Sequence, residues 1–182
     1  MACQSLFLHG IVQDCNGNLG GVSDVWLINR EDISGVTVSS AYTINGISGV
    51  PMISEITLDA DKSFKHFYVR KNTSSMNSTL NVNDNGSSYV TTELNLVFAR
   101  MDAQKRLEMN ALAKEDIAAL VKDANGTWFY LGKDNPVTSN AGTGETGVQK
   151  SDNNQYTSTL LDDSTEYPFI VDPAAIEALG LE

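Results

Sequence analysis

Residues 94–131, LNLVFARMDAQKRLEMNALAKEDIAALVKDANGTWFYL, contain in one run the local patterns from which the fold can be predicted. The run begins inside residues 90–98, where apolar and polar side chains alternate, and a period of two is typical of a half-buried β-strand. One face of this strand is apolar, with Val90, Leu94, Leu96 and Phe98, and the other carries Thr91, Glu93 and Asn95. We therefore expect a sheet that covers a core with one face only.

A helix is predicted next, over residues 103–113. Asp102 stands at the N-cap position, and the residues after it are mostly good helix formers. We expect Asp102 to pair with Arg106 on the exposed side of this helix. A narrow apolar stripe recurs every four residues and is expected to pack on a sheet: Ala103, Leu107 and Ala111.

The run ends in a predicted hairpin. Asn125-Gly126 lies between the apolar segments 117–121 and 127–131, and an Asn-Gly pair in this position favours a tight β-turn. The whole run therefore predicts a sheet with one helix against it.

Further strands are predicted along the rest of the chain. In residues 25–30, Trp26 and Ile28 lie opposite Val25 and Leu27, so both faces are expected to be covered. A last helical turn is expected over residues 173–179, with Asp172 as cap and Pro173 at the first position. The remaining predicted strands span residues 4–12, 36–44, 53–58, 62–71 and 155–161, with turns at residues 45–46 and 49–51.

Two polar segments interrupt this pattern. Residues 72–88 are rich in Ser and Asn, with Asn85-Gly86 as a turn, and they predict a long hairpin arm over about residues 70–90. Residues 134–154 are rich in Gly, Asn, Thr and Ser and are expected to form a mobile loop.

Length and composition bound the fold class. The chain has 182 residues, 41% of them hydrophobic and 19% charged, which predicts a single folded domain over residues 1–182 with a core of its own. Many short strands and one substantial helix indicate a mainly β fold. We expect an antiparallel β-sandwich or small barrel with one α-helix and a long β-hairpin arm.

The charge and the terminal sequence limit the possible partners. A net charge of −11 argues against a groove that binds nucleic acid through its phosphates. Cys3 and Cys15 are too few for a disulfide framework, so we expect free thiols, with a single bridge as the alternative. The start of the sequence shows no secretory signal pattern and no apolar run is long enough to span a membrane, which predicts a protein made in the cytoplasm without a membrane partner.

No catalytic, cofactor-binding or metal-binding residues are predicted. Gly142, Gly144 and Gly147 have the G-x-G-x-x-G spacing, but the residues after them form a poor helix, so a flexible loop is the expected explanation. No serine lies in a G-x-S-x-G turn, so neither His9 nor His66 can be assigned as the base of a serine nucleophile. Close carboxylate pairs are expected to be solvated charges: Asp59 with Asp61, Glu115 with Asp116, and Asp162 with Asp163. The cations and aromatics of residues 62–71 are expected to form an amphipathic strand whose charged side is solvated or faces a neighbouring subunit.

The carboxy-terminal half resembles the tail tube proteins of long-tailed bacteriophages, especially those of Bacteroides-type hosts. In that family a strand ends in D-x-N-G, an aromatic strand ending in Gly follows, and a T-G-rich loop leads to a D-x-x-x-Y-T-x-T-L strand. The corresponding segments here are IAALVKDANGTWFYLG (117–132), AGTGETG (141–147), DNNQYTSTL (152–160) and YPF (167–169). They match in order and rough spacing, whereas the first 90 residues show less similarity.

The resemblance implies a virion structural protein of the phage tail, assembled in the bacterial host cytoplasm. Such subunits close into rings, six-membered in the family, and the rings stack into a tube that conducts double-stranded DNA. The implied partners are further copies of the chain, neighbouring tail proteins such as a tape-measure protein, and DNA in transit without specific binding. We expect a strand pair with Glu93 and Asn95 to face the bore, where acidic or neutral side chains let phosphates pass.

Two other functions remain as alternatives. The first is a head-to-tail or tail-end joining ring protein of the same fold. The second is a β-sandwich carbohydrate-binding module, for which Trp26, Trp128 and Tyr130 are the candidate aromatic platform. An enzyme is not expected, because no nucleophile is placed with a base.

Overall fold

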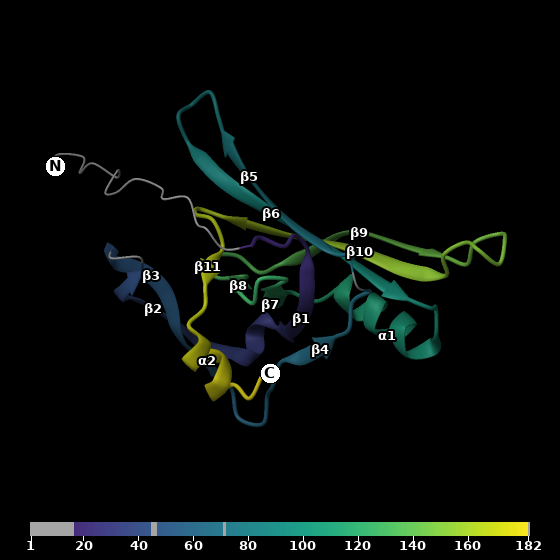
Figure 1. Cartoon of the computed structure of the whole chain (residues 1–182), viewed down its shortest axis with the longest axis horizontal. Coiled ribbons are helices and arrows are strands. Elements are labelled where there is room, and N and C mark those ends of the chain that lie inside the picture. Colours follow the sequence, from purple (N-terminus) through teal and green to yellow (C-terminus); the bar gives the residue numbers. More distant parts are fainter. Residues whose placement is uncertain (1–16, 45–46, 71, 182) are drawn as a thin grey trace.

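The computed structural model describes residues 17–44, 47–70 and 72–181, which form layered sheets with two short helices (Figure 1). All strand pairs within the sheets are antiparallel. The predicted fold class, mainly β with antiparallel sheets, is confirmed. The predicted strand over residues 4–12, together with Cys3, His9 and Cys15, lies outside the described residues.

A five-stranded sheet forms the middle layer, in the order β11-β8-β7-β1-β4. Along its strand β1, Val25 and Leu27 belong to one core, and Trp26 and Ile28 belong to a second core on the opposite face. Both faces are therefore covered, as the sequence predicted. The strands of this sheet are β1 (Val22–Asn29), β4 (Lys65–Phe67), β7 (Ile117–Asp123), β8 (Trp128–Leu131) and β11 (Phe169–Ile170).

The predicted Asn-Gly hairpin is confirmed as the connection between β7 and β8. Gly126 has a φ of +87°, which glycine adopts without the steric cost of a side chain. The Asp123 carboxylate accepts hydrogen bonds from the amides of Asn125 at 2.9 Å and Thr127 at 2.7 Å. The Asp123 side chain therefore stabilises the turn that follows it.

A four-stranded sheet packs on one face of the middle layer, in the order β5-β6-β10-β9. Its inner side chains, such as Leu94, Leu96 and Leu160, share a core with Val25 and Val121 of the middle sheet. This packing of two sheets around a common core is the sandwich expected from the alternation in residues 90–98. The strands are β5 (Ser75–Val82), β6 (Ser88–Ala99), β9 (Thr138–Glu145) and β10 (Gln155–Ser164).

The predicted hairpin arm is formed by β5 and β6. Its far end stands away from the body of the molecule (Figure 1). At the tip, the amide of Gly86 donates to the Asn83 carbonyl and the amide of Asn83 donates to the Ser87 carbonyl, both at 2.9 Å. The expected turn at Asn85-Gly86 is thus confirmed.

The expectation of an unstructured loop over residues 134–154 is wrong for part of that segment. Strand β9 occupies Thr138–Glu145 and pairs with β10 along its length. The glycines have a packing role there, because a Cβ on Gly144 would lie 2.7 Å from the ring atom Cε1 of Tyr156. The strand was missed because an edge strand with exposed side chains on both faces needs no apolar alternation.

The third layer consists of a two-stranded ribbon and helix α2 (Pro173–Ala178), which cover the other face of the middle sheet. The ribbon is formed by β2 (Ile33–Ile44) and β3 (Ile47–Leu58), and a short 3-10 helix, η1 (Arg30–Asp32), precedes it. The predicted turn at residues 49–51 is wrong, since these residues lie within β3; Pro51 is tolerated because β3 has a single strand neighbour. Helix α2 begins as predicted, with the Asp172 carboxylate accepting from the Ala174 amide.

Helix α1 (Ala103–Leu112) begins as predicted but packs by a different face. The Asp102 carboxylate accepts from the Lys105 amide at 2.9 Å and pairs with the Lys105 ammonium at 2.6 Å, so the expected partner Arg106 is wrong. The predicted stripe is wrong too, because Leu107 is 68% exposed while Leu112 is buried and Met109 packs on the core. Burying these two long side chains removes more apolar area from water than burying alanines would.

Candidate functional site: the polar face of the four-stranded sheet

The four-stranded sheet has one apolar and one polar side. Along β6 the inner residues Val90, Leu94 and Leu96 are at most 1% exposed, while Glu93 and Asn95 between them turn outward. This division confirms the alternation on which the sequence prediction rested. The side facing away from the middle layer is called the polar face below.

Strand pairing places the outward residues of four strands in cross-strand rows. Asn95 lies between Ser75 of β5 and Thr159 of β10, and Ala141 of β9 continues the same row. The polar face is mainly hydroxyl and amide, with three carboxylates among its members. They are Ser75, Asn77, Thr79, Asn81, Tyr89, Thr91, Glu93, Asn95, Val97, Ala99, Thr138, Ala141, Thr143, Glu145, Gln155, Thr157, Thr159, Leu161 and Asp163.

Hydrogen bonds between strands tie these side chains to one another. The Thr159 hydroxyl donates to the side-chain oxygen of Asn95 at 2.7 Å, and the side-chain nitrogen of Asn95 donates to the Glu93 carboxylate at 3.2 Å. A second chain runs from the Asn81 amide to the Thr91 hydroxyl at 3.2 Å, and from that hydroxyl to the Asp163 carboxylate at 2.7 Å. Donors on the face are therefore used within it.

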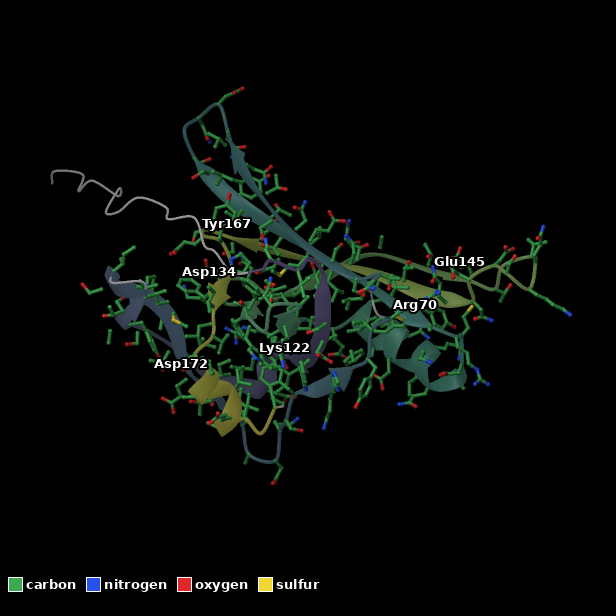
Figure 2. All side chains as sticks on the ribbon, viewed as in Figure 1. Arg70, Lys122, Asp134, Glu145, Tyr167 and Asp172 are labelled. Atoms are coloured by element: carbon green, nitrogen blue, oxygen red, sulfur yellow. The ribbon has the colours of Figure 1, made fainter. Side chains whose placement is uncertain are left out.

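The β9 side of the face is organised in the same way. The hydroxyls of Thr143 and Thr157 lie 2.6 Å apart, and the Gln155 amide donates to the Glu145 carboxylate at 2.8 Å. Figure 2 shows Glu145 close to the β9–β10 turn, while Asp134, just before β9, lies toward the other end of the sheet. The face thus extends over the whole length of β9.

The electrostatics of the polar face are one-sided. Glu93, Glu145 and Asp163 carry its charges, and none of its described members is Lys or Arg. Nucleic acid phosphates are held mainly by cationic contacts, so a surface of carboxylates, amides and hydroxyls can lie next to a polyanion without retaining it.

The edges of this sheet carry few of the usual devices against strand pairing, apart from one register shift in β9 opposite Thr159 and Leu160 of β10. In the described part of the chain, β5 has β6 as its strand neighbour and β9 has β10, so each offers one open backbone edge. The sequence of β5, SMNSTLNV, holds no charge and no Pro, and β9, TSNAGTGE, has its single charge at the last residue. Natural proteins normally protect such edges with charges, Pro or bulges.

The aromatic and cationic segment over residues 62–71 does not form a platform. Phe64 is buried, and the ring of His66 stacks on Trp26 with centroids 4.3 Å apart while its Nε2 lies 3.1 Å from the Asp24 carboxylate. Strand β4 covers three residues of the segment. Beside it runs a groove of about 470 Å³ toward α1, with Phe67, Phe98 and Met109 among its lining residues.

The aromatic residues proposed for a carbohydrate platform are buried. Trp26, Trp128 and Tyr130 are 4%, 7% and 1% exposed, and all three belong to the core between the middle sheet and the ribbon. The expected sugar-stacking surface at these residues is therefore wrong. An aromatic ring that stacks on a sugar must present its face to solvent.

The other sequence motifs are placed as follows. Gly142 and Gly144 lie in β9 and are followed by a turn and strand β10, so no helix amino terminus points at them. The expectation that Asp162 and Asp163 are both solvated is wrong for Asp162, which is 3% exposed, because the two side chains turn to opposite faces of β10. Within the described ranges no group of three or more His, Cys, Asp or Glu is arranged to hold a metal ion, and neither helix is long and apolar enough to cross a membrane.

Sequence reasoning identified Glu93 and Asn95 but missed the half of the face that β9 and β10 supply. Thr157 and Thr159 alternate with the buried Ser158 and Leu160, and that alternation is a usable signal for β10. Thr143 and Glu145 gave no comparable signal. Comparisons with protein-family models, with curated proteins and with solved structures found no match.

Proposed function

We propose that the chain is a structural subunit of a bacteriophage tail tube, which assembles into stacked rings and conducts double-stranded DNA. The observation that carries this proposal is the polar face, an anionic and internally hydrogen-bonded sheet surface between two open edges. It agrees with the resemblance of residues 117–169 to tail tube proteins, and that resemblance is independent of the sheet geometry.

Ring closure follows from the two edges. Strands β5 and β9 lie at opposite ends of one sheet, so β5 of one copy can pair with β9 of the next. Such a contact joins two different surfaces, and repetition around a closed rotation produces a ring. Six copies, as in the resembling family, would then form a continuous wall from their four-stranded sheets.

In this arrangement the polar face lines the bore. Each copy contributes Glu93, Glu145 and Asp163, and no cation of the described face opposes them. A cationic wall would hold DNA by many phosphate contacts, each of which releases counterions when it forms. An anionic wall leaves the DNA free to move, and this is what a conduit requires.

The projecting parts supply contacts between stacked rings. The far ends of the hairpin arm and of the β2–β3 ribbon stand away from the body (Figure 1). On the arm, Leu80 is 49% exposed and Val82 is 70% exposed, so an apolar strip is available for a neighbouring copy. A tape-measure protein and other tail proteins are further proposed partners.

The experiment that tests this function reverses the charge of the bore. Virions assembled with the triple variant Glu93→Lys, Glu145→Gln and Asp163→Lys are expected to release DNA at least about tenfold more slowly, because lysines bind phosphates. Release is measured with a DNA-binding dye after ejection has been triggered. The matched control is Glu31→Lys, Glu108→Gln and Glu177→Lys, which makes the same charge change at exposed positions away from the face.

The control virions should release DNA at the wild-type rate. Equal rates for both triple variants and the wild type would contradict a bore lined by the polar face. Purified protein that forms single rings and never tubes would favour the joining-ring alternative.

A further inference from the structure

Asp162 is a carboxylate buried between the two larger sheets. It is 3% exposed, whereas its neighbour Asp163 turns to the polar face and bonds to Thr91 there. The Gly132 amide hydrogen-bonds to the Asp162 carboxylate, but its oxygen Oδ1 has no hydrogen-bond partner among the described residues. Buried charges without full pairing are rare, because removing them from water is costly.

The groups around Asp162 form a polar row inside the sandwich. Thr92 lies directly opposite Asp162 on β6, and Ser78 lies opposite Thr92 on β5. The hydroxyls of Ser78 and Thr92 are 2.8 Å apart, and Thr92 is 1% exposed. The side chain of Tyr130 belongs to the core on the other face of the middle sheet, and its hydroxyl, like Asp162 Oδ1, has no hydrogen-bond partner in the described part of the chain.

Charged groups reach this row from several elements. Arg30 of η1 donates from Nε to the Gly132 carbonyl at 2.9 Å and acts electrostatically on Tyr130. Asp134, which follows β8, and Asp163 of β10 act on Asp162 with like charge. In this structure no described cation forms an ion pair with Asp162.

We propose that Asp162 is a protonation switch between the two larger sheets. When it is neutral, the row holds no charge and the packing of the two sheets is undisturbed. When ionised, it can only accept, and it leaves an uncompensated charge between the sheets that loosens their packing.

The pH range follows from the pKa of Asp162. Burial raises this pKa from 3.8 to about 6, the Gly132 amide opposes the rise, and Asp134 and Asp163 add to it. Burial raises the pKa of Tyr130 to about 12, so its hydroxyl stays protonated over this range. Because the folded state holds its proton more tightly than the unfolded state, the stabilisation is fully present below the unfolded pKa of 3.8 and is lost as the pH rises to the folded pKa of about 6.

Equilibrium urea unfolding of the full chain between pH 5 and pH 8 tests the switch. Folding raises the pKa of Asp162 by about two units, and about one of these units lies above pH 5. The unfolding equilibrium constant of the wild type should therefore rise about tenfold between pH 5 and pH 8, relative to that of Asp162→Asn. Asp163→Asn is the matched control, since the adjacent carboxyl is exposed; its constant should follow the wild type. Protection factors at the amides of β8 and β10, which correct for the intrinsic rise of exchange with pH, should fall between pH 5 and pH 7 in the wild type and stay constant in Asp162→Asn.

A carbon-13 titration of the Asp162 carboxyl in the folded wild type gives a reading that does not depend on any variant folding. A midpoint near pH 6 supports the switch. A midpoint near the ordinary Asp value, or the same pH dependence of unfolding in the wild type and Asp162→Asn, would overturn it.

Discussion

Two glycines with left-handed backbone angles show how single residues limit this fold. Gly126, in the β7–β8 turn, has a φ of +87° and no atom within 4 Å of the place a Cβ would take. Gly132, just after β8, has a φ of +95°, and there a Cβ would lie 3.1 Å from the Ala118 Cα and 3.2 Å from the Ile117 carbonyl oxygen. The first position would add conformational strain alone, and the second would add strain and backbone crowding.

Alanine substitution should therefore separate the two costs. We expect Gly126→Ala to lower the free energy of unfolding by about 1 kcal/mol, and Gly132→Ala to lower it by about 1–3 kcal/mol more, because the backbone of β7 must shift. Urea denaturation of both variants measures the difference. Equal losses in the free energy of unfolding would show that the backbone of β7 accommodates the added methyl group without a measurable cost.

Residue-scale chemistry was predictable from the sequence where a residue acts on its own neighbours in the chain. Asp102, Asp172 and the Asn125-Gly126 turn were all identified correctly, since a cap or a turn depends on a few adjacent residues. The burial of Asp162 was not predicted, because it depends on Thr92 and Tyr130 from distant strands.

At the scale of elements, the two edge strands are the features on which the proposed assembly depends. Neither β5 nor β9 carries a charge within its central residues, and a lysine on an edge strand is a common natural barrier to pairing. The interior strand β10 presents side chains to the same polar face without offering a backbone edge. This contrast provides a matched pair of variants.

Lysines at the edge should prevent association, whereas lysines in the interior should not. We expect Asn77→Lys with Thr79→Lys in β5 to reduce the protein to a monomer, as measured by size-exclusion chromatography with light scattering. Thr157→Lys with Thr159→Lys in β10 makes the same charge change on the same face and should keep the oligomer. The same oligomeric state in both double variants would argue against pairing through β5.

Elements were predicted well where one face is buried and poorly where neither face is. The buried strands β1, β6 and β7 show apolar patterns that indicate them directly. Strand β9 is exposed on both faces, and helix α1 turns Leu107 to solvent although the spacing favoured its burial. At both elements, partners distant in sequence decide the packing.

For the whole molecule, the sequence predicted the mainly β class but not the layering. The middle sheet is covered on one face by the four-stranded sheet and on the other by the β2–β3 ribbon and α2. The alternation within each strand indicates which face is buried, but it cannot indicate which sheet covers it. The continuity of the polar face across β5, β6, β10 and β9 was therefore visible only in the folded chain.

The central claim is that copies of this chain join edge to edge into a ring whose bore is the polar face. Negative-stain electron microscopy of the purified full chain at high concentration tests it most directly. The account predicts rings or stacked tubes with a stain-filled central channel. A uniform population of single subunits, with no ring at any concentration, would contradict it.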